Sequence, residues 1–184
     1  MLTWIVFLPL LGVIAVALLP RSASGYAKWI ALGVTAADLA LAGVMLAGFD
    51  VAAGMQYLVD VAWIEQAGIR YAMGVDGMSA PLVALSALLT FLAVVASWKI
   101  ERKPAFYFAM LLLLQVGMNG VFAALDFVLF YVFWELVLVP MYFLIAQWGG
   151  PRREYAAIKF FLYTLLGSVF MLVGMIVLRL QLGT

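Results

Sequence analysis

The side chain with the clearest chemical potential in this sequence is Glu135, which lies in a long apolar stretch. It is eight residues into a predicted helix over 127–148, which is about 12 Å along a membrane core of about 30 Å. A charge at that depth costs several kcal/mol, so it needs a partner, a hydrated cavity or a function. Because a neighbouring cation changes the proton affinity of a buried carboxyl group, Glu135 is predicted to be a proton-relay carboxylate. The alternative is a structural glutamate that is hydrogen-bonded to a neighbouring helix.

Polar residues at helical spacing suggest a proton path near Glu135. Tyr131 precedes Glu135 by one turn and lies on the same helical face. On the preceding predicted helix, Gln115 and Asn119 also share a face. That pattern is typical of hydrogen bonds between helices, and it also suits the lining of a hydrated path. We therefore include all three residues in the candidate proton path.

Two further charges lie within predicted spans. Lys159 is about 6–8 Å deep, so its stem can reach the headgroups, and it is about 10 Å from Glu135 along the membrane normal. That separation favours a water-bridged link over a direct ion pair, and we add Lys159 to the candidate path, with snorkelling as the alternative. Asp38 lies near the middle of another span among small residues, which suits a cross-helix hydrogen bond. A partner subunit or a role in proton transfer are the alternatives for Asp38.

The composition places the chain in a membrane. Its 184 residues are 68% hydrophobic and 10% charged, against roughly 45–50% and 25% in soluble domains. Nineteen charges cannot cover a water-exposed surface of this size, so a soluble globular domain is excluded. The sequence has no cysteine and no histidine, which excludes disulfides, thiolate iron–sulfur ligation, Cys/His zinc sites and Ser–His nucleophiles. The sequence contains no block of lysine and arginine residues of the kind that indicates nucleic-acid binding.

Six apolar stretches are long enough to cross a bilayer, which requires about 20 residues per helix. We therefore predict an all-α integral membrane protein with six transmembrane helices, over residues 2–19, 28–49, 81–98, 105–125, 127–148 and 155–179.

The loops between the spans differ in charge. Most of the basic residues follow the first, third and fifth spans, which assigns that side to the cytoplasm and both termini to the outside. The long outer loop 50–80 contains two β-favouring runs around 66–68, so a short β-hairpin is predicted there. Asp76 and Asp126, at the outer rim, are predicted to be turn or helix-capping residues. The basic residues of the assigned cytoplasmic side are Arg21, Lys28, Lys99, Arg102, Lys103, Arg152 and Arg153.

Several motifs occur in a fixed order from the third span onward. Tyr-Ala-Met-Gly-Val-Asp-Gly-Met-Ser fills 71–79, and Gly-Val-Phe-Ala-Ala-Leu-Asp-Phe fills 120–127. Phe-Trp-Glu-Leu-Val-Leu-Val-Pro-Met-Tyr-Phe-Leu-Ile follows at 133–145, then Gln-Trp-Gly-Gly at 147–150 and Lys-Phe-Phe-Leu-Tyr-Thr at 159–164. In this order and spacing they resemble the antiporter-like subunit M family of proton-pumping NADH:quinone oxidoreductase (respiratory complex I).

The resemblance implies a function. The chain would be an enzyme subunit in the membrane arm that contributes to proton translocation coupled to NADH oxidation by quinone. It would bind no cofactor, since NADH, FMN, iron–sulfur clusters and quinone are expected in other subunits. Its partners would be other membrane-arm subunits, including neighbouring antiporter-like ones, in a bacterial inner (plasma) membrane. In the family the helix-5 glutamate, here Glu135, pairs with a lysine on a broken seventh helix.

The sequence also departs from the family pattern, because family members are much longer and contain two inverted repeats. Residues 1–184 would be one membrane domain, with peripheral helices and the outer loop in 1–98 and the start of the first repeat in 105–184. An incomplete antiporter-like fold of this kind, without the seventh-helix lysine, is not expected to pump alone. The alternatives are a subunit of a multisubunit cation/proton antiporter or membrane-bound hydrogenase, and a non-pumping scaffold fragment.

Overall fold

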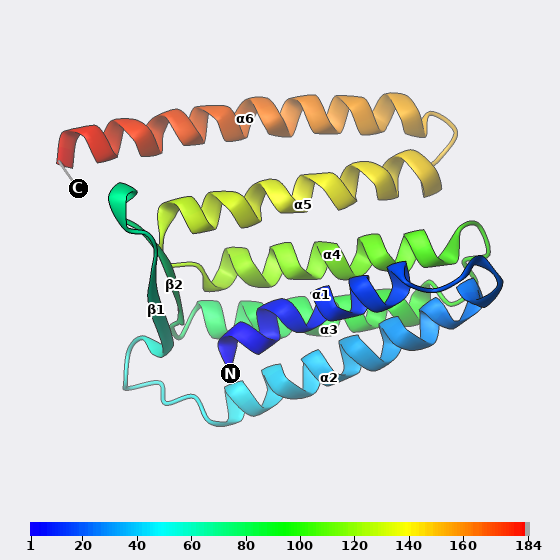
Figure 1. The fold of residues 1–184 in the computed structure, drawn as a ribbon, viewed down its shortest axis with the longest axis horizontal. Coiled ribbons are helices and arrows are strands. Elements are labelled where there is room, and N and C mark those ends of the chain that lie inside the picture. Colours follow the sequence, from blue (N-terminus) through cyan, green and yellow to red (C-terminus); the bar gives the residue numbers. More distant parts are fainter. Residues whose placement is uncertain (183–184) are drawn as a thin grey trace.

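Six α-helices form the bulk of the computed structural model, which describes residues 1–182 (Figure 1). They are α1 (Leu2–Ala17), α2 (Ala27–Ala47), α3 (Ser79–Ala96), α4 (Pro104–Ala123), α5 (Phe127–Trp148) and α6 (Arg153–Leu182). Short 3-10 helices, η1 (Arg21–Tyr26) and η2 (Glu65–Ala67), and a hairpin of β1 (Gln56–Ile64) and β2 (Ile69–Val75) complete this part of the chain. The predicted all-α membrane architecture with six helices is confirmed.

The lengths of the helices differ from the prediction at both ends of the chain. In the described residues, five helices are long and apolar enough to cross a membrane, and α1 is a shorter apolar helix of 16 residues. The predicted first span continued to residue 19, but α1 ends at Ala17 because Pro20 follows and the residue before a proline avoids the helical conformation. At the other end, α6 is longer than predicted and has 30 residues.

Helix α4 is the centre of the bundle. It packs against α1, α2 and α3 on one side and against α5 on the other. Helix α6 is the outermost helix, and it packs along α5 (Figure 1). Only 6% of the apolar stretch of α6 is buried, so this helix presents a long apolar surface.

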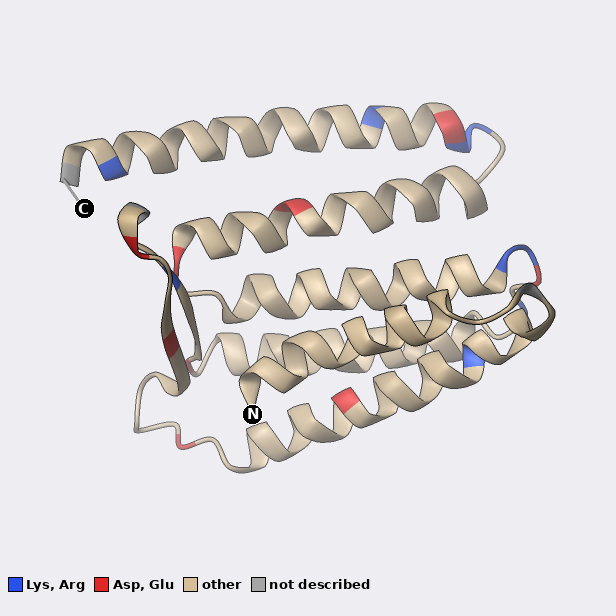
Figure 2. Cartoon of the chain, in the orientation of Figure 1, with Lys and Arg blue, Asp and Glu red and all other residues tan. Residues whose placement is uncertain are grey.

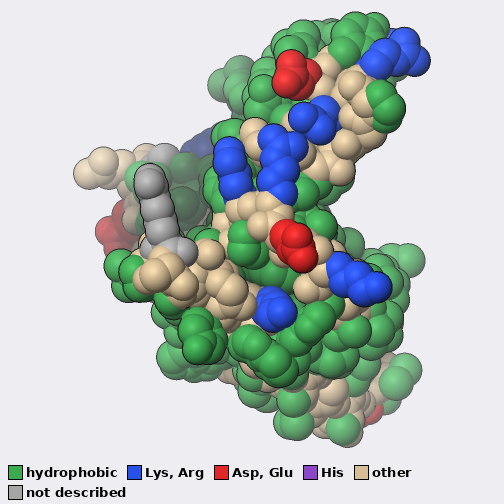
Figure 3. Space-filling view, turned by 90° about the vertical axis from the view of Figure 1, so that its right-hand side faces the viewer, with side chains coloured by type: hydrophobic (Ala, Val, Ile, Leu, Met, Phe, Trp, Pro, Cys, Tyr) green, Lys and Arg blue, Asp and Glu red, His purple; other side chains and the backbone are tan. Residues whose placement is uncertain are grey.

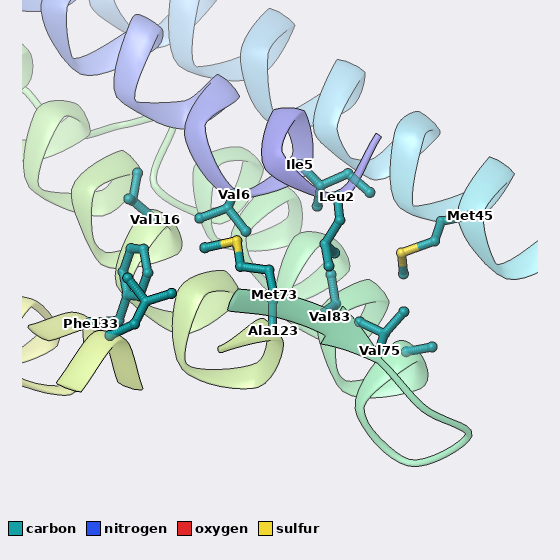
Figure 4. Close-up of a cluster of buried hydrophobic side chains, with 12 residues drawn as sticks. Leu2, Ile5, Val6, Met45, Met73, Val75, Val83, Val116, Ala123 and Phe133 are labelled. Carbon is teal, nitrogen blue, oxygen red and sulfur yellow. The ribbon is translucent and has the colours of Figure 1, made fainter. Parts of the chain in front are cut away.

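Two apolar clusters fill the bundle, one toward each end. The cluster at the hairpin end joins α1, α2, α3, α4, α5 and β2 (Figure 4), and the cluster at the opposite end joins α1, α2, α3 and α4. The first contains Leu2, Ile5, Val6, Met45, Met73, Val75, Ala80, Val83, Val116, Ala123, Leu129 and Phe133; the second contains Val16, Ala27, Ala31, Val94, Phe108, Ala109, Leu111 and Leu112.

The predicted hairpin is confirmed. Strands β1 and β2 pair antiparallel around η2, and Gly68 takes the left-handed conformation at the turn, with φ of 63°. The hairpin crosses one end of the bundle (Figure 1). There β2 reaches the α4–α5 connection, where the amide of Leu125 donates to the carbonyl of Ala72 at 2.9 Å.

Charged residues gather at the two ends of the bundle and leave the middle of the helices nearly bare (Figure 2). The start of α1 and the end of α6 lie toward the end of the bundle that carries the hairpin (Figure 1). Figure 3 views the opposite end, where lysine and arginine side chains gather around the helix ends. This distribution agrees with the basic loops predicted after the first, third and fifth spans.

Candidate functional site

The candidate site begins with the residue that starts α5. Asp126 caps this helix: its Oδ1 accepts hydrogen bonds from the amides of Val128 (2.8 Å) and Leu129 (3.0 Å). Its Oδ2 accepts a further bond from the amide of Arg70 in β2, at 3.2 Å. The predicted capping role is confirmed, and the cap ties the start of α5 to the hairpin. Glu135 is therefore held at a fixed depth, two turns into α5.

Close packing against α4 sets the rotation of α5. A Cβ at Gly120 would overlap the ring of Phe133, and a Cβ at Gly117 would lie 2.7 Å from Cγ2 of Val137. Only glycine permits this approach, so α5 turns Phe133 and Val137 toward α4. Glu135 is about 200° around the helix from Phe133, which turns its side chain away from α4 and toward the α6 side.

Glu135 is half-buried, and its polar neighbourhood is sparse. Its Oε1 atom is enclosed and has no hydrogen-bond partner among the described residues. The phenol of Tyr131 interacts with the Glu135 carboxyl group and with Ser168 of α6. An enclosed carboxyl oxygen without a donor is costly unless it binds a proton, a water molecule or a further group, and that is the chemical capability of this site.

Two cavities lie next to the polar residues at the interface between α5 and α6. A cavity of about 300 Å³ at the hairpin end is lined by Tyr131, Asp126 and Arg179, among others. A second cavity of about 550 Å³, between α4, α5 and α6, is lined by Trp134 and Ser168, among others. Both linings are mainly apolar, and their polar groups include Tyr131 in the first cavity and Ser168 in the second. Tyr131 and Ser168, which interact with each other, therefore border separate cavities.

The other predicted path residues lie elsewhere. Lys159 is exposed near the basic end of α6, with its Nζ atom 5.8 Å from the centre of the Tyr155 ring. It lines a groove of about 760 Å³ together with Arg152 and Arg153. Within residues 1–182, Lys159 forms no ion pair with Glu135.

Gln115 and Asn119 face Asp38 of α2. Nε2 of Gln115 donates to Oδ2 of Asp38 at 2.6 Å, and Nδ2 of Asn119 donates to the same oxygen at 3.1 Å. Nδ2 of Asn119 also donates to the carbonyl of Ile5 in α1, at 3.1 Å. The cross-helix hydrogen bond expected for Asp38 is confirmed.

Sequence reasoning missed two features of these sites. It did not single out Ser168, which no helical spacing links to Tyr131 because the contact crosses from α5 to α6. It also did not pair Gln115 and Asn119 with Asp38. Three polar side chains at mid-depth on otherwise apolar helices were a usable signal for that pairing. In the described residues, no group of three or more acidic side chains is arranged to hold a metal ion.

Comparison with known proteins identifies the family. Residues 2–119 match the family described as NADH-ubiquinone oxidoreductase chain 4, amino terminus. This chain belongs to the chain 4, or subunit M, family. Residues 124–184 match a second family, described as NADH:quinone oxidoreductase/Mrp antiporter, transmembrane.

Individual members of the chain 4 family are similar over nearly the whole chain. It is 46% identical over 179 residues to an NAD(P)H-quinone oxidoreductase chain 4 of Synechococcus sp. (strain JA-3-3Ab), covering 94% of this chain and 33% of that protein. It is 44% identical over 189 residues to NADH-quinone oxidoreductase subunit M of Rhodobacter capsulatus, covering 100% and 36%. The chain thus spans about a third of the length of these relatives.

Solved structures agree with this family. A chain of respiratory complex I from Thermus thermophilus with bound NADH superposes with a TM-score of 0.86 at 28% identity, covering 100% of this chain and 37% of that chain. A chain of an archaeal membrane-bound sulfane sulfur reductase has the same fold, with a TM-score of 0.78 at 20% identity over 98% of this chain and 28% of that one. The resemblance predicted from the motifs is confirmed, and the chain has the fold of a multi-pass membrane subunit of complex I, in part.

Proposed function

We propose that this chain works as part of a membrane-arm subunit of NADH:quinone oxidoreductase and contributes to proton translocation coupled to NADH oxidation by quinone. The observation that carries the proposal is Glu135: a carboxyl group at mid-depth in a chain 4 family member, with one enclosed oxygen lacking a donor. An enclosed carboxyl oxygen without a donor is costly unless it binds a proton or a water molecule. At Glu135 this oxygen lies next to the Tyr131 phenol, which interacts with the carboxyl group and with Ser168 of α6.

In this proposal Glu135 takes up and releases the translocated proton. Tyr131 is its first polar neighbour, and the adjoining cavity leads from Tyr131 to the outer rim. Lys159 remains a candidate for the path at the basic end, where it borders the groove beside α6. Gln115 and Asn119 are the least supported of the four, since their donors are directed at Asp38.

The proposal extends to partners, cofactors and location. The chain is held among other membrane-arm subunits, including antiporter-like ones, in a bacterial inner (plasma) membrane, with the basic end in the cytoplasm. NADH, FMN, iron–sulfur clusters and quinone bind to other subunits, in keeping with a sequence that has no cysteine or histidine. Residues 1–98 form the peripheral part of one membrane domain, and residues 105–184 open the first repeat.

A subunit of a cation/proton antiporter is the second candidate function. It is favoured by the match of residues 124–184 to a family that includes Mrp antiporters. The match of residues 2–119 is to the oxidoreductase family alone, and for this reason we prefer the first function. Sodium-driven proton exchange that is independent of NADH would support the antiporter.

The test is the Glu135→Gln substitution in the complex that contains this chain. Glutamine has nearly the same shape but cannot exchange a proton in the relay. We expect assembly to survive while proton pumping and coupled NADH oxidation fall. Glu101→Gln, which changes an exposed acid in the loop after α3, serves as the matched control and should leave both activities unchanged. Wild-type pumping in Glu135→Gln would refute the proposed role.

A further inference from the structure

A second buried carboxyl group lies outside the proposed site. Asp38 is at the middle of α2 and has no exposed surface. Its hydrogen-bond partners Gln115 and Asn119, on α4, are also fully buried. Along α2, Asp38 lies between Ala31 of one apolar cluster and Met45 of the other. The relay assigned to Glu135 does not use this polar cluster of Asp38, Gln115 and Asn119.

The hydrogen bonds of this cluster are unbalanced. Both amide groups donate to Oδ2 of Asp38, so that Oδ1 of Asp38 has no donor. The amide oxygens of Gln115 and Asn119 also lack a partner. The cluster therefore has three enclosed acceptor atoms without a donor. One proton on Oδ1 of Asp38 would turn an unpaired acceptor into a donor for one of the two amide oxygens.

Among the side chains that the structure describes, no cation lies within salt-bridge distance of Asp38. Helices α1 (residues 2–17) and α3 have no ionisable side chain, and α4 has only Tyr107, in its first turn. On α2 itself the only other charge is Lys28, ten residues before Asp38, about 15 Å along the axis. Lys28 lies instead over the ring of Trp98, 4.9 Å from its centre. In the sequence, Arg21 of η1 is 17 residues before Asp38.

Energetics and hydrogen bonding lead to the same protonation state. An unpaired carboxylate in an apolar interior is far more costly than its neutral acid. We propose that Asp38 is a buried proton-binding site: in the folded chain it is a carboxylic acid that carries its proton on Oδ1 and links α2 to α4. This proposal is independent of the role of Glu135.

Infrared spectroscopy of the assembled complex tests the proposal, because a carboxylic acid and a carboxylate have different C–O stretching bands. We expect the wild-type minus Asp38→Asn difference spectrum to show the loss of one carboxylic-acid carbonyl band. Asp60→Asn is the matched control. Asp60 is half-exposed and ion-paired with Arg70 at 2.6 Å, so its replacement should remove carboxylate bands only.

Two results would overturn the proposal. Loss of carboxylate bands alone in Asp38→Asn would show an ionised Asp38. Carboxylate bands of Asp38 that change when Na⁺ replaces K⁺ would show that the cluster holds a metal cation in place of a proton. If Asp38→Asn does not assemble, Asn119→Ala provides the second test. It removes one donor from Oδ2 and leaves Asp38 in place, so it must shift the frequency of the acid band, and an unshifted spectrum in that region contradicts the proposal.

Discussion

The cap of α5 gives the most quantitative prediction. Asp126→Ala removes the two hydrogen bonds to the first turn of α5 and the third bond to the amide of Arg70. Loss of a helix N-cap costs about 1 kcal/mol, and loss of one further bond to a charged acceptor, half-exposed here, costs about 1 kcal/mol more. We therefore expect the free energy of unfolding to fall by about 2 kcal/mol. For a chain of this size that corresponds to about 4–8 °C in Tm.

The assay is thermal unfolding of the purified chain in detergent, followed by tryptophan fluorescence. Asp126→Asn keeps one side-chain oxygen for the cap and loses the bond to Arg70, so its Tm should lie between those of the wild type and Asp126→Ala. Asp50→Ala is the control, since Asp50 accepts a bond from the amide of Ala52 in an exposed loop and caps no helix. If Asp126→Ala lowers Tm no more than Asp50→Ala does, the cap does not hold α5 to the hairpin.

Two further predictions concern the hairpin end and the α4–α5 contact. The pKa of Asp76 is lowered, chiefly by hydrogen bonds from the amide and hydroxyl of Ser79 and from a further backbone amide. The ionised Asp76 carboxylate therefore stabilises the folded chain fully above the unfolded pKa of about 3.9, and this stabilisation is lost as the pH falls through the lower pKa of the folded state. When the pH is reduced from 5 toward 2, Tm should fall less steeply in Asp76→Asn than in the wild type. Parallel curves of Tm against pH would contradict this. Gly120→Ala should lower the free energy of unfolding by about 1–3 kcal/mol, because the added methyl group overlaps the Phe133 ring. Gly33→Ala is the control and should cause no loss of this kind, since its methyl group meets nothing within 4 Å. Equal Tm values for the two variants would refute the packing argument.

Most of the fold could be predicted because a membrane chain shows its helices directly as apolar stretches. Helix α5 begins and ends where the sequence predicts, because Asp126 is a strong cap and Gly149 follows the last turn. The hairpin was also predictable, since β-favouring residues flank a glycine that takes a left-handed conformation. The length of α1 was not predicted, because a hydropathy pattern continues smoothly to Pro20 and does not show where the helical conformation stops.

The candidate site was predictable only within a single helix. Tyr131 and Glu135 were brought together correctly because four residues make one turn. The partners of Asp38 were not predicted, because spacing gives the face of each helix but not the rotation of one helix relative to another. That rotation depends on contacts such as Gly120 against Phe133, where the absence of a side chain sets the approach.

The two membrane carboxyl groups differ in the physical conditions that proton exchange requires. A group that exchanges protons needs a route for them and a neighbour that can rearrange. Glu135 comes nearer to both conditions, since it is half-buried and interacts with the phenol of Tyr131, which borders a cavity. Asp38 has neither, because it is fully enclosed and held by amides of a central helix. Substitutions at Asp38 should therefore act on the stability of the α1–α4 packing, whereas Glu135→Gln should act on turnover in a complex that still assembles.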